Sequence, residues 1–112
     1  MDNITLITET FESFMGKEVC SIHKLNNVPN NQVYKIETEP QSYIFKIYAK
    51  RDWPEDGKLP FITKKLDEYK IPHAKLYVFD RDNDNFPNGY LIEEYLFGVT
   101  VVRLRFLIQE RN

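Results

Sequence analysis

The run Tyr43-Ile44-Phe45-Lys46-Ile47-Tyr48 decides the fold of this chain. Its aromatic and β-branched residues favour a strand, and it follows a polar turn, Glu39-Pro40-Gln41-Ser42. The stretch before that turn, Gln32 to Thr38, alternates apolar and polar residues in the way of a half-buried strand. We therefore expect a β-hairpin around this turn.

Further strands are predicted on both sides of the hairpin. Val19 to Leu25 has strand composition, and the Asn-rich residues 26–31 supply a turn after it, so three successive antiparallel strands are expected. Downstream, Leu76 to Phe79 and Tyr90 to Ile92 are predicted to form a second hairpin, with Asn88-Gly89 as a strong turn signal.

Two segments have the spacing of helices. From Ile4 to Met15 apolar residues recur at helical intervals, and Gly16 is suited to end the helix. We expect the Phe and Met side chains of this leading helix to lie in the core. A second helix is expected from about Pro60 to Tyr69, with three apolar residues on one face: Ile62, Leu66 and Tyr69.

Composition indicates one folded domain and excludes some classes of partner. The chain has 112 residues, of which 42% are hydrophobic, enough to bury a core and far from a disordered composition. Fifteen basic and seventeen acidic residues give a net charge of −2, so neither nucleic acid nor a membrane is expected as a partner. The start of the chain lacks the pattern of a signal peptide, which predicts a cytoplasmic protein. The single cysteine, Cys20, is expected to be a small buried residue.

Four segments, in their order and spacing, resemble the amino-terminal lobe of the aminoglycoside phosphotransferase and choline kinase group. They are Asn31 to Ile36, Tyr43 to Tyr48, Ile71 to Lys75 and Gly89 to Gly98. These enzymes are small-molecule kinases with a protein-kinase-like fold. The resemblance implies an α+β lobe, with a five-stranded antiparallel sheet, a helix between the third and fourth strands and a hinge at the end. Residues 1–98 would form the lobe, and residues 99–112 would begin a carboxy-terminal lobe.

Lys46 is the candidate phosphate ligand. A lysine on the solvated face of an antiparallel strand is common, but Ile44 and Tyr48 share the face of Lys46. A cleft explains a lysine with apolar neighbours better than open water does. By resemblance, Lys46 would contact the phosphates of ATP and pair with an acid on the following helix. Glu55 is the candidate acid, with a first-turn acid that favours the helix dipole as the alternative.

The remaining candidate nucleotide contacts lie in a turn and in the hinge. Asn26 to Asn31 takes the position of the kinase glycine-rich loop but contains no glycine. Because asparagine tolerates left-handed conformations, Asn30 and Asn31 are candidate phosphate contacts, and a plain hairpin turn is the alternative. By resemblance, adenine would bind the backbone carbonyl of Glu94 and the backbone N–H of Leu96. The alternative there is a strand end and a turn.

The catalytic machinery of the family has no counterpart in the sequence. Neither His23 nor His73 is followed two residues later by Asp, as the family's catalytic loop requires, and no Asp-Phe-Gly occurs. No catalytic or metal-binding residue is assigned. The acidic loop from Asp80 also fails as a calcium loop, because Asn85 and Leu91 occupy its sixth and twelfth positions.

Two functions remain open from the sequence. The first is an ATP-binding lobe, with Mg²⁺ expected by resemblance, that is inactive alone and is either an excised piece or a truncated gene product. The second is a non-catalytic interaction domain that retains the fold of the lobe. In both cases the apolar side chains of the tail, residues 99–112, are expected to be buried against another surface. We expect that surface to belong to a second copy of the chain, in a homodimer, or to a missing second lobe.

Overall fold

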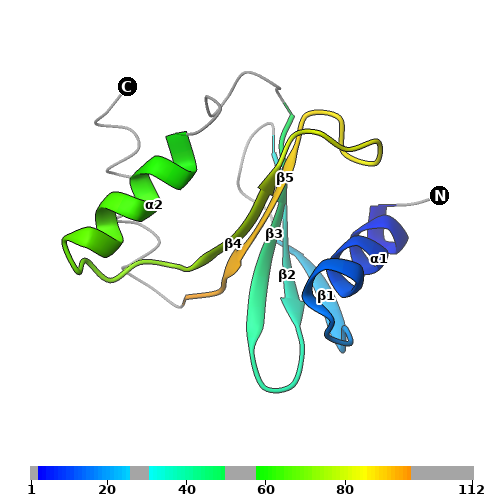
Figure 1. The fold of residues 1–112 in the computed structure, drawn as a ribbon. Coiled ribbons are helices and arrows are strands. Elements are labelled where there is room, and N and C mark those ends of the chain that lie inside the picture. Colours follow the sequence, from blue (N-terminus) through cyan, green and yellow to red (C-terminus); the bar gives the residue numbers. More distant parts are fainter. Residues whose placement is uncertain (1–2, 26–30, 50–57, 97–112) are drawn as a thin grey trace.

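The computed structural model describes residues 3–25, 31–49 and 58–96 of the chain. These residues form two helices and five strands (Figure 1). In chain order they are α1 (Asn3–Met15), β1 (Ser21–Leu25), β2 (Gln32–Glu37), β3 (Ser42–Ile47), α2 (Lys58–Glu68), β4 (Leu76–Asp80) and β5 (Tyr90–Glu94). None of the described helices is both long and apolar enough to cross a lipid bilayer.

All five strands belong to one open antiparallel sheet with the order β1-β2-β3-β5-β4. β1, β2 and β3 follow one another through short connections, and α2 then carries the chain from β3 to β4. β5, the last strand in the sequence, lies between β3 and β4. The predicted hairpins and the α+β class with a five-stranded antiparallel sheet are therefore confirmed.

The two helices lie on opposite sides of the sheet (Figure 1). α1 covers one face with Ile7 and Phe11, which pack with Phe45 in the larger hydrophobic cluster. Phe45 also stacks on Tyr90, with ring centroids 5.1 Å apart. α2 covers part of the other face, where Leu59 packs in a second cluster. Because successive side chains of a strand point to opposite faces, Phe45 is directed to α1 and Lys46 to the side of α2.

Both helices end at a residue in the left-handed conformation. Gly16 has φ 66°, and its N–H donates to the carbonyl of Glu12 at 2.9 Å, so the predicted end of α1 is confirmed. After α2, Lys70 has φ 56°. Its N–H donates to the carbonyl of Asp67 at 3.0 Å, and the N–H of Ile71 donates to that of Leu66 at 2.9 Å. These two bonds form a Schellman motif built on a lysine.

Three predictions of burial are wrong. Phe14 is 51% exposed; its side chain lines an open hollow along α1, with Asn85 and Tyr90. Tyr69 is 72% exposed, because α2 ends at Glu68 and the chain turns away there. Cys20 is exposed, since it precedes an edge strand that has a neighbour on one side only.

Candidate functional site

The strand register places an apolar residue directly opposite Lys46 on each neighbouring strand. Lys46 lies opposite Val33 of β2 and Leu91 of β5. Both neighbours are buried, and Lys46 itself is half-buried. Ile44 and Tyr48 stand two residues away on either side and share its face. The prediction that Lys46 has apolar neighbours on its own face of the sheet is confirmed.

Two cations approach the buried ring of Tyr48. Lys46 Nζ lies 5.7 Å and Arg81 Cζ 5.5 Å from the ring centroid, and Phe79 packs edge-on at 5.6 Å. Burial raises the pKa of the Tyr48 phenol above its usual range, the charge of Glu93 raises it further, and Arg81 opposes them. The phenol therefore stays neutral, and the two cations favour an anionic group at this part of the face.

Glu93 is an acid on the same face that the sequence analysis did not single out. It lies opposite Ile44 and therefore stands diagonally from Lys46 across β3 and β5. Diagonal neighbours in an antiparallel pair are about 7–8 Å apart, which long side chains can span. Glu55, the acid predicted to pair with Lys46, lies outside the described residues. Glu93 is a second candidate for that role.

The turn end of the site is described only from Asn31 onward. The side-chain oxygen of Asn31 accepts a hydrogen bond from the N–H of Ala49 at 3.0 Å. The side chain of Asn88 donates to the carbonyl of Ala49 at 2.9 Å. Asn31 thus ties the start of β2 to the residues that follow β3. Asn30, the other predicted phosphate contact in this turn, lies outside the described residues.

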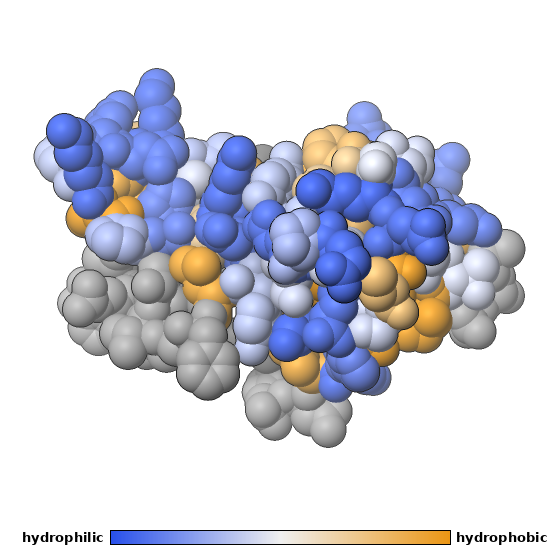
Figure 2. Space-filling view, turned by 90° about the horizontal axis from the view of Figure 1, so that it is seen from below, coloured by the Kyte–Doolittle hydropathy of each residue, from blue (hydrophilic) through white to orange (hydrophobic). Residues whose placement is uncertain are grey.

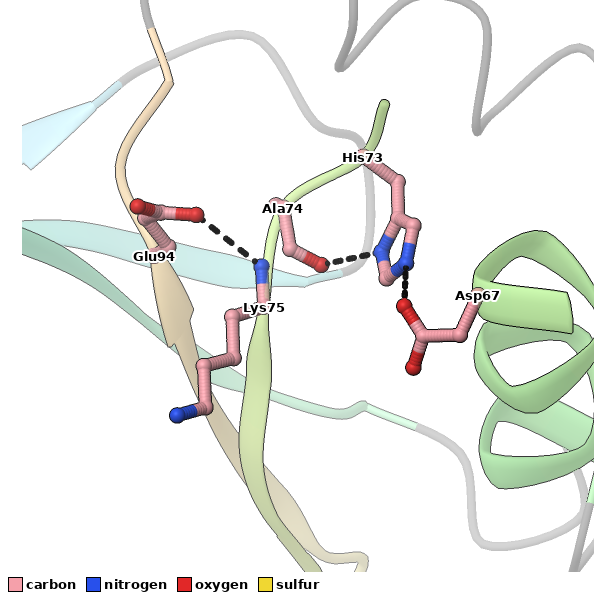
Figure 3. Close-up of polar contacts among 5 residues, drawn as sticks. All are labelled: Asp67, His73, Ala74, Lys75 and Glu94. Carbon is pink, nitrogen blue, oxygen red and sulfur yellow. Dashed lines mark hydrogen bonds and ion pairs between the residues drawn. The ribbon is translucent and has the colours of Figure 1, made fainter. Parts of the chain in front are cut away.

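The end of β5, where the sequence predicts a hinge, is held by backbone and side-chain bonds. The N–H of Glu94 donates to the carbonyl of Lys75 at 2.8 Å, and its carboxylate accepts from the N–H of Lys75 at 3.2 Å (Figure 3). Tyr95 donates its N–H to the carbonyl of Ser42 at 3.2 Å. Leu96, the last described residue before the tail, is half-buried. The adenine contacts predicted for Glu94 and Leu96 stay predictions.

A second lysine on the same face approaches Tyr95, the residue that follows β5. Lys35 of β2 lies opposite Ile44, and its ammonium is 4.3 Å from the centroid of the Tyr95 ring. Lys35 and Lys46 are therefore diagonal neighbours on one face, the first toward the hinge and the second toward the turn. The sequence analysis missed Lys35 and Tyr95, because only the register between strands reveals that they belong to this face.

A serine, a histidine and a glutamate lie close together on β1 and β2, but they are not arranged as a catalytic triad. Ser21 donates to Oε1 of Glu37 at 2.5 Å, and Nε2 of His23 bonds the same oxygen at 2.9 Å. The bond from Ser21, then that from His23, holds the pKa of the Glu37 carboxyl below its ordinary value. In a catalytic triad the histidine would bond the serine. Here both bond the carboxylate, so the cluster joins the two strands.

Two open hollows lie along α1 and away from Lys46. The larger, of about 580 Å³, is lined by Glu12, Gly16, Lys17, Glu18 and Val19. The smaller, of about 480 Å³, is lined by residues of α1 together with Asn85 and Tyr90. Neither contains a residue from the face of Lys46. Their position gives no support to a role in the predicted nucleotide site.

Comparisons of the chain with protein-family models, with curated proteins and with solved structures found no match. The functional argument therefore depends on the residues themselves and on their arrangement.

Proposed function

We propose that this chain is the nucleotide-binding lobe of a small-molecule kinase similar to the aminoglycoside phosphotransferases and choline kinases. The observation that carries the proposal is the position of Lys46: half-buried on a central strand, between Val33 and Leu91, on the sheet face that α2 partly covers. A lysine so placed can hold its ammonium against phosphate oxygens while apolar neighbours keep water away.

In the proposed complex, the ligand lies along this face with its base at one end and its phosphates at the other. Glu94 lies opposite Tyr43, three residues along β3 from Lys46, a separation of about 10 Å at the rise of a strand. In the proposal, the base binds the backbone at Glu94 and Leu96 and packs under Ile44 and Val33. The phosphates extend past Lys46 toward the turn of Asn30 and Asn31.

Phosphoryl transfer itself would need groups from a second lobe. Within the described ranges, no three His, Cys, Asp or Glu side chains gather as a metal site. The Mg²⁺ that accompanies ATP in such kinases is therefore assigned to no residue in the part of the chain that the structure describes. The lobe would bind and orient the nucleotide in the cytoplasm, and Glu55 or Glu93 would hold the Lys46 ammonium in place.

Calorimetric titration of the chain with ATP and Mg²⁺ tests the proposal. The variants are Lys46→Ala, Lys46→Arg and a matched control, Lys24→Ala, whose lysine lies opposite Tyr34 and so faces the other side of the sheet. We expect saturable binding by the wild type and the control, and affinity at least about tenfold weaker in Lys46→Ala, the scale of one charge-assisted contact. A folded chain that does not bind, or that binds equally well without Lys46, would refute the proposal.

Exposed apolar side chains favour a second candidate, an interaction domain. Phe61 on α2 is exposed, as are Tyr69 and Ile71 just after it. On the side seen in Figure 2, hydrophobic areas are separate patches among hydrophilic side chains. Apolar residues scattered singly are ordinary on a protein surface, so this candidate depends on the three exposed residues named above. The predicted dimer contact, residues 99–112, lies outside the described residues, and sedimentation equilibrium over a range of concentrations tests it.

A further inference from the structure

The smaller hollow along α1 brings together polar side chains and an exposed aromatic ring from distant parts of the chain. Its described lining residues belong to α1, to the connection between β4 and β5, and to β5: Glu9, Thr10, Ser13, Phe14, Asn85 and Tyr90. The four residues from α1 stand at i, i+1, i+4 and i+5, so they share one side of the helix. A volume of about 480 Å³ suits a small molecule.

Tyr90 is the buried polar residue of this hollow. It is only 5% exposed, and its ring stacks on Phe45 in the core. Burial raises the pKa of the Tyr90 phenol above its ordinary value, and the charge of Asp80 raises it further, so the hydroxyl keeps its proton. A buried tyrosine hydroxyl usually has a hydrogen-bond partner. Within the part of the chain that the structure describes, that of Tyr90 has none. The hollow that it lines is therefore the place for a partner.

Phe14 and Glu9 indicate the charge of a ligand. Phe14 is 51% exposed, and the face of an aromatic ring attracts a cation. Glu9 is also exposed and carries the only formal charge among the described lining residues. Asp80 lies opposite Tyr90 in the register of β4 and β5 and adds negative charge nearby. The hollow therefore favours a cation over an anion.

The other lining residues can bind the polar groups of a ligand. Thr10 is half-buried, and Ser13 and Asn85 are exposed. In the described ranges, none of these three side chains is hydrogen-bonded to another protein group. A hydroxyl and an amide can each donate and accept a hydrogen bond. They can accommodate hydroxyl or amide groups on a ligand whose charge is held elsewhere.

We infer that this hollow is a binding site for a small organic amine with an apolar or aromatic body. The ammonium pairs with Glu9, the body packs on the exposed ring of Phe14, and the hydroxyl of Tyr90 forms a hydrogen bond with the ligand. The site lies on the α1 side of the sheet, whereas Lys46 is directed to the side of α2. It is therefore separate from the proposed nucleotide site and does not depend on that function.

Nuclear magnetic resonance of the ¹⁵N-labelled chain, titrated with benzylamine, tests the inference. Benzyl alcohol has the same ring without the charge, and benzoate carries the opposite charge. We expect benzylamine at millimolar concentrations to shift the amides of Ser13, Phe14 and Asn85 in a saturable way. Benzyl alcohol should bind about tenfold more weakly, and benzoate should not bind. If benzylamine leaves these amides unshifted, or if benzoate binds as well, the inference is wrong.

Variants at exposed positions, which should keep the fold, separate the contacts. Glu9→Gln removes the carboxylate and should weaken benzylamine binding about threefold to fivefold, the scale of an exposed ion pair. Phe14→Ala removes the ring and should weaken it by a similar factor. Glu18→Gln is the matched control, because Glu18 is an exposed acid that lines the other hollow, and it should bind as the wild type does. Equal losses in Glu9→Gln and Glu18→Gln would mean general attraction by an acidic surface and would overturn the site.

Discussion

The ammonium of Lys35 lies 4.3 Å from the centroid of the Tyr95 ring, so a contact joins β2 to the residue after β5 across the strand between them. A second bond anchors Tyr95, from its N–H to the carbonyl of Ser42. The segment that follows β5 is therefore fixed to two other strands before the tail begins. This anchoring is what gives the candidate hinge a defined position.

A double-mutant cycle measures the first of these contacts. Lys35→Met and Tyr95→Leu, alone and together, should reveal a coupling of about 0.5–1 kcal/mol, the size of a cation–π pair near the surface. Urea denaturation supplies the free energies of unfolding. The pair Lys75 and Tyr77, at 5.1 Å and only two residues apart in sequence, is the control and should couple more weakly. Additive effects of Lys35→Met and Tyr95→Leu would mean that the contact does not stabilise the fold.

The two phenylalanines of α1 should differ widely when truncated. Phe11 is fully buried and meets Tyr43 edge to face, with centroids 5.1 Å apart. Phe11→Ala should cost about 3–5 kcal/mol of unfolding free energy. Phe14→Ala should change it by no more than about 0.5 kcal/mol, because Phe14 is exposed. Thermal melts of both variants, followed by circular dichroism, make the comparison. Equal losses would mean that α1 packs differently.

Lys70→Gly should stabilise the protein. A left-handed conformation costs a non-glycine residue about 1–2 kcal/mol, and part of this gain is offset by the greater freedom of glycine in the unfolded chain. We expect a net increase of about 0.5–1 kcal/mol in urea denaturation. The reverse change, Gly16→Ala, serves as the partner experiment. A Cβ there meets nothing within 4 Å, so its expected loss of about 1 kcal/mol is purely conformational. A destabilised Lys70→Gly would contradict the observed helix end.

Glu37 should contribute stability that acid removes. Its carboxyl pKa lies below the ordinary value of 4.5, first because Ser21 donates to it and then because His23 does. A lowered folded-state pKa means that the contribution is complete above about pH 4.5 and is lost as the pH falls through the folded-state value. Wild type should therefore exceed Glu37→Gln in stability at neutral pH and converge with it in acid. Ser21→Ala should narrow the gap, and a gap independent of pH would refute the assignment.

The sequence predicted the elements well because their signals are local. Alternation marks β2 and β3, and helical spacing marks α1 and α2, within a few residues of each end. Periodicity indicates which way a side chain points but not how far the covering surface extends, which is why Phe14 and Tyr69 were misplaced. The place of β5 between β3 and β4 was not predicted, since no local pattern encodes it.

The candidate site was predictable only where local alternation along a single strand defines it. The parity of one strand was enough to put Lys46 beside Ile44 and Tyr48. Lys35 and Glu93 joined that face only when the register aligned three strands, and register depends on contacts between segments distant in sequence. The two hydrogen bonds of the His73 ring were not predicted, because its partners are an oxygen of the backbone and an acid on the preceding helix.

The position of β5 also governs how the chain can assemble. β1, β2 and β3 can pair with one another as soon as they are made. The other side of β3 pairs with β5, which ends only at Glu94. β4 has no partner in the sheet until the same strand arrives. Closing this long loop makes the sheet dependent on distant contacts, which slows folding and leaves the incomplete chain open to wrong pairing. A chain that stops before β5 would leave a three-stranded sheet and an unpaired β4 rather than a smaller version of the whole sheet.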